Sequence, residues 1–175
     1  MPKNLSANQI ANLTGQNYLV DYLVEITRSD GVTLWWTDSP FGFDRATDTS
    51  GGSQTFVPNK ILGISNIELR SFLTDTKVSI IVQDDLSLIT ALGNNYETMT
   101  IRIYIQFRDP ADNSIDTSAN PIGVFDGHVV AVNSSFNNES NEIQIDCSKL
   151  LVYADAKPKV AQYTTGLISN DFGAK

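Results

Sequence analysis

The sequence predicts an all-β, mainly antiparallel domain, either a β-sandwich or a split β-barrel, with one short helix and extended arms. Residues 99–109, MTIRIYIQFRD, alternate apolar and polar side chains, the pattern of a strand with one buried face. Residues 18–36 contain two β-type runs joined by a short segment with Asp30 and Gly31, which is typical of a hairpin. The chain has no repeated β–helix–β pattern, and this argues against a doubly wound parallel sheet.

The elements before residue 99 follow in chain order. The first run of the hairpin places Asp21 and Glu25 on the face opposite its apolar residues. Residues 37–55 hold one Pro, three Gly and many Ser, Thr and Asp, and predict a long loop. The segments after it are predicted as short strands and turns at 56–72, a strand at 76–83 with Val78, Ile80 and Val82 inward, and a short helix from Asp84 or Asp85 to Gly93.

The second half of the chain adds three more strands. Met99, Ile101, Ile103, Ile105 and Phe107 form the predicted inner face of the 99–109 strand. After a polar excursion at 110–121, a strand at 122–132, a hairpin tip at 133–141 and a closing strand at 142–150 are predicted. In the closing strand Ile143, Ile145 and Cys147 share one face.

Composition predicts one folded domain with polar arms. The 175 residues are 41% apolar and 18% charged, which suits a folded protein with a real core. Residues 1–17 are predicted as an N-terminal arm, 18–160 as the β domain and 161–175 as a C-terminal extension. The N-terminal residues lack the apolar stretch of a signal peptide, and no run approaches the ~18 apolar residues of a membrane-spanning helix.

Charge and cysteine content argue against several classes of protein. The net charge is −8, and the basic residues form no cluster, so binding to nucleic acid or to an anionic membrane is disfavoured. Cys147 is the single cysteine, which excludes an internal disulfide and a Cys-rich zinc site. We expect no cofactor.

Few residues suggest catalysis. His128 is the single histidine and shares a strand face with Asp126, but the chain has no nucleophile elbow, P-loop or dinucleotide-binding motif. We therefore expect no enzymatic activity. The best metal candidate is a weak calcium site in the loop after the 99–109 strand, formed by Asp109, Asp112, Asn113 and Asp116, although its spacing is not that of an EF-hand.

Aromatic residues give the clearest hint of a binding surface. Trp35 and Trp36 point to opposite faces of one strand, so one belongs to the core and the other must be covered by a loop or a partner. Phe41 and Phe43 follow in the next segment. We predict a partner interface at these four residues. A carbohydrate- or receptor-binding module would use the same aromatics and is the alternative function.

The order of these pieces resembles the small tail-tip proteins of long-tailed bacteriophages, in the broad class of distal-tail and baseplate-hub proteins. The resemblance covers about residues 18–165. It rests on five segments: VEITRSDGVTLWWTDS, QTFVPNKILGISNIEL, TKVSIIVQDDLSLITALGNN, MTIRIYIQFRD and GVFDGHVVAVNSSFNNESNEIQIDCSKL.

The resemblance implies a virion structural protein, made in the host cytoplasm and located at the tail tip. Copies would form an oligomeric ring between the tail tube and the hub or receptor-binding apparatus. In such a ring the second face of the 99–109 strand would meet water or a neighbouring copy. A hexamer is favoured and a trimer is the alternative. The implied neighbours are the tail tube protein, a hub protein and the tape measure protein.

Overall fold

The computed structural model describes residues 18–48, 50–65, 76–83, 99–109, 111–115, 120–136 and 141–149, together with Ala7, Ile10, Ile67 and Thr117. The helix predicted at 84–93, most of the 1–17 arm and the 161–175 extension lie outside these residues. The predicted domain boundaries therefore stay predictions.

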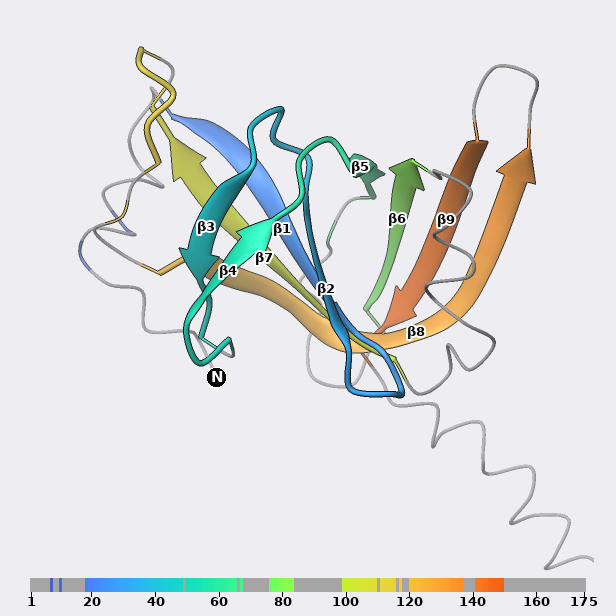
Figure 1. Ribbon diagram of the computed structural model, residues 1–175. Helices are drawn as coiled ribbons and strands as arrows, with labels where there is room; N and C mark the ends of the chain where they lie inside the picture. Colours follow the sequence, from blue (N-terminus) through green and yellow to red (C-terminus); the bar gives the residue numbers. More distant parts are fainter. Residues whose placement is uncertain are drawn as a thin grey trace, which may run out of the picture.

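The described residues form two antiparallel sheets (Figure 1). The large sheet has seven strands in the order β2-β1-β7-β8-β9-β6-β5, and the small sheet pairs β3 with β4. This confirms the predicted all-β, mainly antiparallel fold class. The strands are β1 (Leu19–Thr27), β2 (Thr33–Thr37), β3 (Phe43–Ala46), β4 (Ser53–Phe56), β5 (Ile61–Ile64), β6 (Lys77–Gln83), β7 (Thr100–Arg108), β8 (Ile122–Phe136) and β9 (Asn141–Ser148).

The long strand β8 bends the large sheet. Its first half pairs with β7 and its second half with β9, and the register shifts by one residue in each pairing. Figure 1 shows β8 curving beneath the sheet and rising beside β9. Gly127 lies near the change of partner, and a side chain there would collide with the Ser148 carbonyl and the Phe125 ring. Bulges and a glycine thus allow one sheet to curl over its own core.

Backbone hydrogen bonds connect the two ends of the curled sheet. The Val57 N–H donates to the Trp35 carbonyl and the Thr37 N–H donates to the Val57 carbonyl, both at 3.0 Å. The Lys60 N–H then donates to the Thr37 carbonyl at 3.2 Å, and the Lys60 carbonyl accepts from the Gln83 N–H at 3.0 Å. The segment between β4 and β5 therefore links the edge strand β2 to β6, as in a split barrel.

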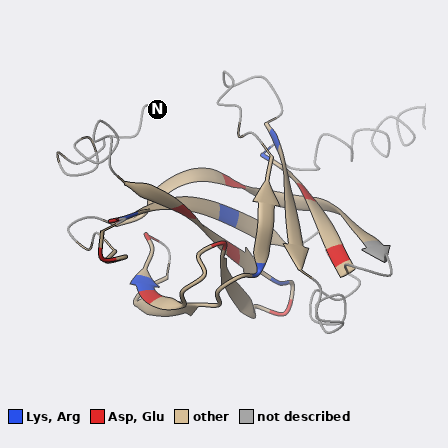
Figure 2. Ribbon diagram, turned by 90° about the horizontal axis from the view of Figure 1, so that it is seen from above, with Lys and Arg blue, Asp and Glu red and all other residues tan. Residues whose placement is uncertain are grey.

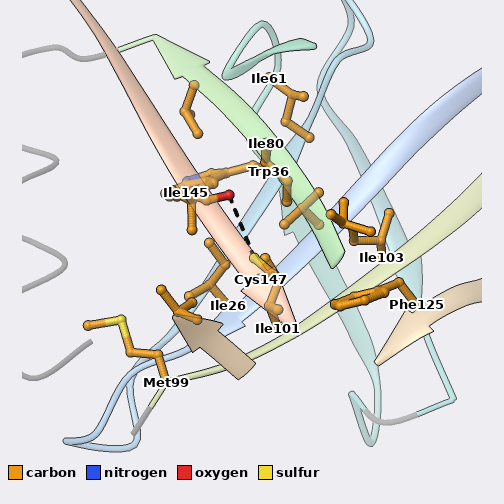
Figure 3. Packing of buried hydrophobic residues seen from close by; sticks show 14 of the residues in the cluster. Ile26, Trp36, Ile61, Ile80, Met99, Ile101, Ile103, Phe125, Ile145 and Cys147 are labelled. Carbon is orange, nitrogen blue, oxygen red and sulfur yellow. Dashed lines mark hydrogen bonds between the residues drawn. The ribbon is translucent and has the colours of Figure 1, made fainter. Parts of the chain in front are cut away.

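The inner face of the large sheet carries the aliphatic core (Figure 3). The predicted inward residues of 76–83 and 142–150 are confirmed, as are Met99, which precedes β7, and Ile101 and Ile103 of β7. The Cys147 thiol points at the Ile145 carbonyl across 3.7 Å, and burial raises its pKa to about 12. The core members are Val24, Ile26, Trp36, Ile61, Val78, Ile80, Val82, Met99, Ile101, Ile103, Phe125, Val129, Ile143, Ile145 and Cys147.

Two predicted loops are corrected by the structure. Residues 37–55 do not form one long loop, because β3 and most of β4 lie within them. Tertiary packing decides this segment: Phe43 and Phe56 stack with ring centroids 5.9 Å apart, so two short polar strands gain an apolar contact. The hairpin tip predicted at 133–141 is shorter, since β8 continues to Phe136 and β9 begins at Asn141. Asn133 and Ser134 are exposed, so polar residues suit these strand positions.

Candidate functional site

The small sheet covers the outer face of β1, β2 and β7. In Figure 1, β3 and β4 lie across β1 and β7. The side chains beneath them form a cluster separate from the aliphatic core. We call residues 43–56 the cover. Phe56 is fully buried between the sheets and contacts the Trp35 ring edge-on, with centroids 5.5 Å apart. The apolar cluster beneath the cover consists of Leu23, Phe56 and Tyr104, with Trp35 and Phe43 packed against it.

The cover corrects the expectation for the second face of strand 99–109. Tyr104, Gln106 and Arg108 belong to that face, and all three are buried within the chain itself. The Gln106 side-chain oxygen accepts a 2.9 Å hydrogen bond from Arg45 Nε of β3. This half of the face therefore meets neither water nor a neighbouring copy. The physical reason is that the cover supplies both apolar contacts and polar partners for it.

A buried ion pair lies at one end of this face. Arg108 donates two hydrogen bonds to Asp21, from Nε at 2.8 Å and from Nη2 at 2.9 Å. Its Nη1 donates to the Asn113 side-chain oxygen at 2.8 Å, and its guanidinium lies 5.8 Å from the centroid of the Phe41 ring. The pKa of Arg108 is raised, chiefly by the hydrogen bonds to Asp21. The guanidinium of Arg108 therefore stays charged, and its hydrogen bonds join β1 to β7 and to the following loop.

A second charged group lies farther along the same two strands. Arg102 Nη1 donates to Glu25 at 2.9 Å, and Tyr104 Oη donates to the other Glu25 oxygen at 3.1 Å. Arg102 Nε lies 3.5 Å from the exposed carboxylate of Asp126 on β8. The charges thus alternate across β1, β7 and β8, and Figure 2 shows acidic and basic segments on neighbouring strands of the large sheet.

Asp38 adds a second carboxylate near the Asp21–Arg108 pair. Its Oδ1 accepts a 2.7 Å hydrogen bond from the Tyr22 N–H. Burial raises its pKa to about 6, and repulsion from Asp21 acts in the same direction. The Tyr22 N–H and the Arg108 charge oppose this shift without cancelling it. Two carboxylates therefore lie near one guanidinium at this end of the sheet, and the hydrogen bonds of that guanidinium go to Asp21 and not to Asp38.

The four aromatics of the predicted interface occupy three environments. Trp36 is buried in the aliphatic core. Trp35 and Phe43 pack under or within the cover, so a segment of the same chain covers the second tryptophan. Phe41 is 52% exposed and lies over Arg108. The structure thus does not bring the four together on one surface, and an interface role for them stays a prediction.

The calcium candidates are engaged in the turn that follows β7. Asp109 accepts from the Ala111 N–H and Asp112 from the Ser114 N–H, each at 2.8 Å, while Asn113 accepts from Arg108. Asp116 lies outside the described residues. Among the described residues, no group of three or more His, Cys, Asp or Glu side chains is placed to hold a metal ion.

His128 and Asp126 lie on β8 next to the bend. Asp126 faces Arg102, whereas half-buried His128 is paired in register with Thr100 of β7 and Ser148 of β9. The described contacts therefore give Asp126 an ionic partner other than His128. No helix in the described part of the chain is long and apolar enough to cross a membrane.

Comparisons with known proteins give one kind of match. No family model matches the chain, and no curated protein matches its sequence. A chain from the virion of a native gene transfer agent particle has a similar structure, with a TM-score of 0.57 and 16% sequence identity. The likeness is one of fold. It covers 85% of this chain and 46% of the virion chain, so this chain spans less than half the length of that neighbour.

The sequence interpretation missed the buried charges beneath the cover. Asp21 and Glu25 occupy the non-core face of one predicted strand, and Arg102 and Arg108 occupy the same face of another. Opposite charges at such positions stabilise strand pairs when they face each other. This complementarity was the available signal. It could indicate pairing of the two strands, but not that a hairpin of the 37–55 segment would bury the charges.

Proposed function

We propose that this chain is a structural, non-enzymatic subunit of a phage-type virion and that it lies at the tail tip. The observation that carries the proposal is the fold likeness over 85% of the chain to a chain of the gene transfer agent virion. The order of sequence segments supports it independently, because that order resembles distal-tail and baseplate-hub proteins. The finer location rests on the sequence resemblance alone.

We further propose that copies of the chain form a ring, as a hexamer in preference to a trimer. The ring would join the tail tube to the hub or receptor-binding apparatus, with the tape measure protein as a further neighbour. Heterologous contacts that close by rotation produce a ring, whereas the same contacts without closure produce a filament. The net charge of −8 suits a passage for DNA, because like charges repel and the nucleic acid would not adhere.

The carbohydrate-binding alternative loses its main structural support. A stacking platform for a sugar needs an exposed aromatic face, but Trp36 is buried in the core and Trp35 packs against Phe56. Phe41 alone of the four predicted aromatics is highly exposed. We therefore retain the virion subunit as the proposed function.

Light scattering of the purified full-length chain, followed by negative-stain imaging, tests the ring. We expect a species of six or three copies with a central hole, and its fraction should rise with protein concentration. A chain that stays monomeric at every concentration, alone and mixed with the tail tube protein of the same virus, would contradict the ring.

A further inference from the structure

Asp38 lies where the β1–β2 ladder ends. The last paired residues of the ladder are Leu23 and Thr37. One step farther, the Tyr22 N–H donates to Asp38 Oδ1 at 2.7 Å, and the Asp38 N–H donates to the Tyr22 carbonyl at 3.4 Å. A side-chain carboxyl therefore takes the place of a backbone carbonyl and fixes the first residue of the segment that leads from β2 to the cover.

Asp38 has one acidic and one basic neighbour, but the basic one is hydrogen-bonded to other residues. Asp21 faces it from β1 and Arg108 from β7. The side-chain hydrogen bonds that Arg108 makes in this cluster go to Asp21 and Asn113 and not to Asp38. Among the described residues, the partners of the Asp38 carboxylate are therefore backbone N–H groups, those of Tyr22 and of Asp38 itself, and the Asp21 carboxylate lies nearby. A partly buried carboxylate in such surroundings favours its neutral form.

We propose that Asp38 is a pH-sensitive latch that holds residues 37–42, and through them the cover, against β1. The protonated carboxyl keeps an oxygen that accepts from Tyr22 and carries no charge to desolvate. The ionised carboxylate gains by moving into water, which loosens the segment. The latch is a property of the fold and does not depend on the proposed virion role.

The sign of the pH dependence follows from the raised pKa of Asp38. The pKa of Asp38 is about 6 when the segment is closed, and its ordinary value of 3.8 applies when the segment is open to water. The closed state of residues 37–42 is therefore most stable below about pH 4. Its stability falls as the pH rises to about 6 and stays low above that. A neutral isostere at position 38 should remove the dependence.

Amide hydrogen exchange of the full-length protein tests the latch. Between pH 5 and 7.5, the protection factor of the Tyr22 amide, corrected for intrinsic exchange, should fall by about tenfold in the wild type. In Asp38→Asn it should stay constant at or above the acidic wild-type value. Asp44→Asn is the matched control, because Asp44 is an exposed carboxylate on β3 of the cover, and it should behave as the wild type.

Amides of β6 and β9 provide the internal reference and should keep their protection over the same range. Three results would overturn the proposal. These are a flat wild-type profile, a fall in Asp38→Asn equal to that of the wild type, and an equal loss of protection in β6 and β9. The last result would mean that the whole domain opens rather than the latched segment.

Discussion

Strands β1 and β7 bury side chains on both faces, but the two faces are held by different forces. On the inner face Val24, Ile26, Ile101 and Ile103 have no exposed surface and pack as aliphatic groups. On the outer face the buried residues include two acids, an amide and an arginine. They are Asp21, Glu25, Gln106 and Arg108, and their exposed fractions lie between 3% and 9%.

The two faces differ in how strictly they specify the pairing of β1 with β7. Aliphatic burial is non-directional and tolerates shifts that keep volume and pattern. Buried charges require a particular partner, because an unpaired charge away from water costs much more than a pair. The Asp21–Arg108 and Glu25–Arg102 pairs therefore favour the observed register of β1 against β7. The inner face supplies most of the burial, and the outer face selects the arrangement.

Removal of Arg108 from the outer face should cause the largest loss of stability. Arg108→Met leaves Asp21 buried without its partner, and we expect a loss of about 4 kcal/mol in the free energy of unfolding. Chemical denaturation at pH 7.5 measures it. The double variant Arg108→Met, Asp21→Leu should recover most of the loss, because both charges are then absent. A single variant within 1 kcal/mol of the wild type would show that the pair contributes little.

A cavity on the inner face should have the next largest effect. Ile103→Ala removes buried methyl groups from a side chain with no exposed surface, and the expected loss is about 3 kcal/mol. Ile103→Val, as the control, should lose about 1 kcal/mol. Both losses should be the same in low and high salt, since no charge is involved. A strong salt dependence of the Ile103→Ala loss would contradict the division between the two faces.

Crowding at the bend of β8 should have a smaller effect. Gly127→Ala places a methyl group against the Ser148 carbonyl and the Phe125 ring, and a cost of about 2 kcal/mol is expected for this overpacking. Thermal unfolding measures the cost. Gly52→Ala is the matched control, because nothing lies near its added methyl group, and it should change stability little. Equal stabilities for the two variants would mean that the bend is not tightly packed.

The exposed ion pair in the β1–β2 turn should have the smallest effect. Arg28 and Asp30 lie 2.6 Å apart, but solvent screens the pair. Arg28→Ala should cost less than about 0.5 kcal/mol, in contrast with the buried Arg108. The same denaturation experiment measures it, and a loss close to that of Arg108→Met would remove the distinction between exposed and buried pairs.

Sequence patterns predicted the parts of the fold that local physics determines. Alternation located β6, β7 and β9, and Asp30 with Gly31 located the first hairpin, whose Gly31 has a φ of 83°. The inner residues of these strands were predicted because aliphatic alternation is read directly from the chain. The full length of the β8–β9 hairpin was not predicted, because polar residues occupy the exposed faces of strands as well as loops.

The outer face could not be predicted to the same extent. The β3 and β4 strands have four residues each, and their burial depends on Phe56 reaching Trp35 and Tyr104 across the sheet. No local pattern reports such a contact. For the same reason Trp35 and Phe43 suggested a partner surface, whereas the chain's own cover contacts them. The latch at Asp38 depends on the same long-range packing.

The most direct test of the proposed virion role is the composition of purified particles. Particles from the organism that encodes the chain would be purified, analysed by mass spectrometry and labelled with antibodies to the full-length protein. The account predicts that the 19.2 kDa chain is present in a fixed, small number of copies and that the label lies at the end of the tail. Intact, DNA-containing particles that lack the chain would contradict it.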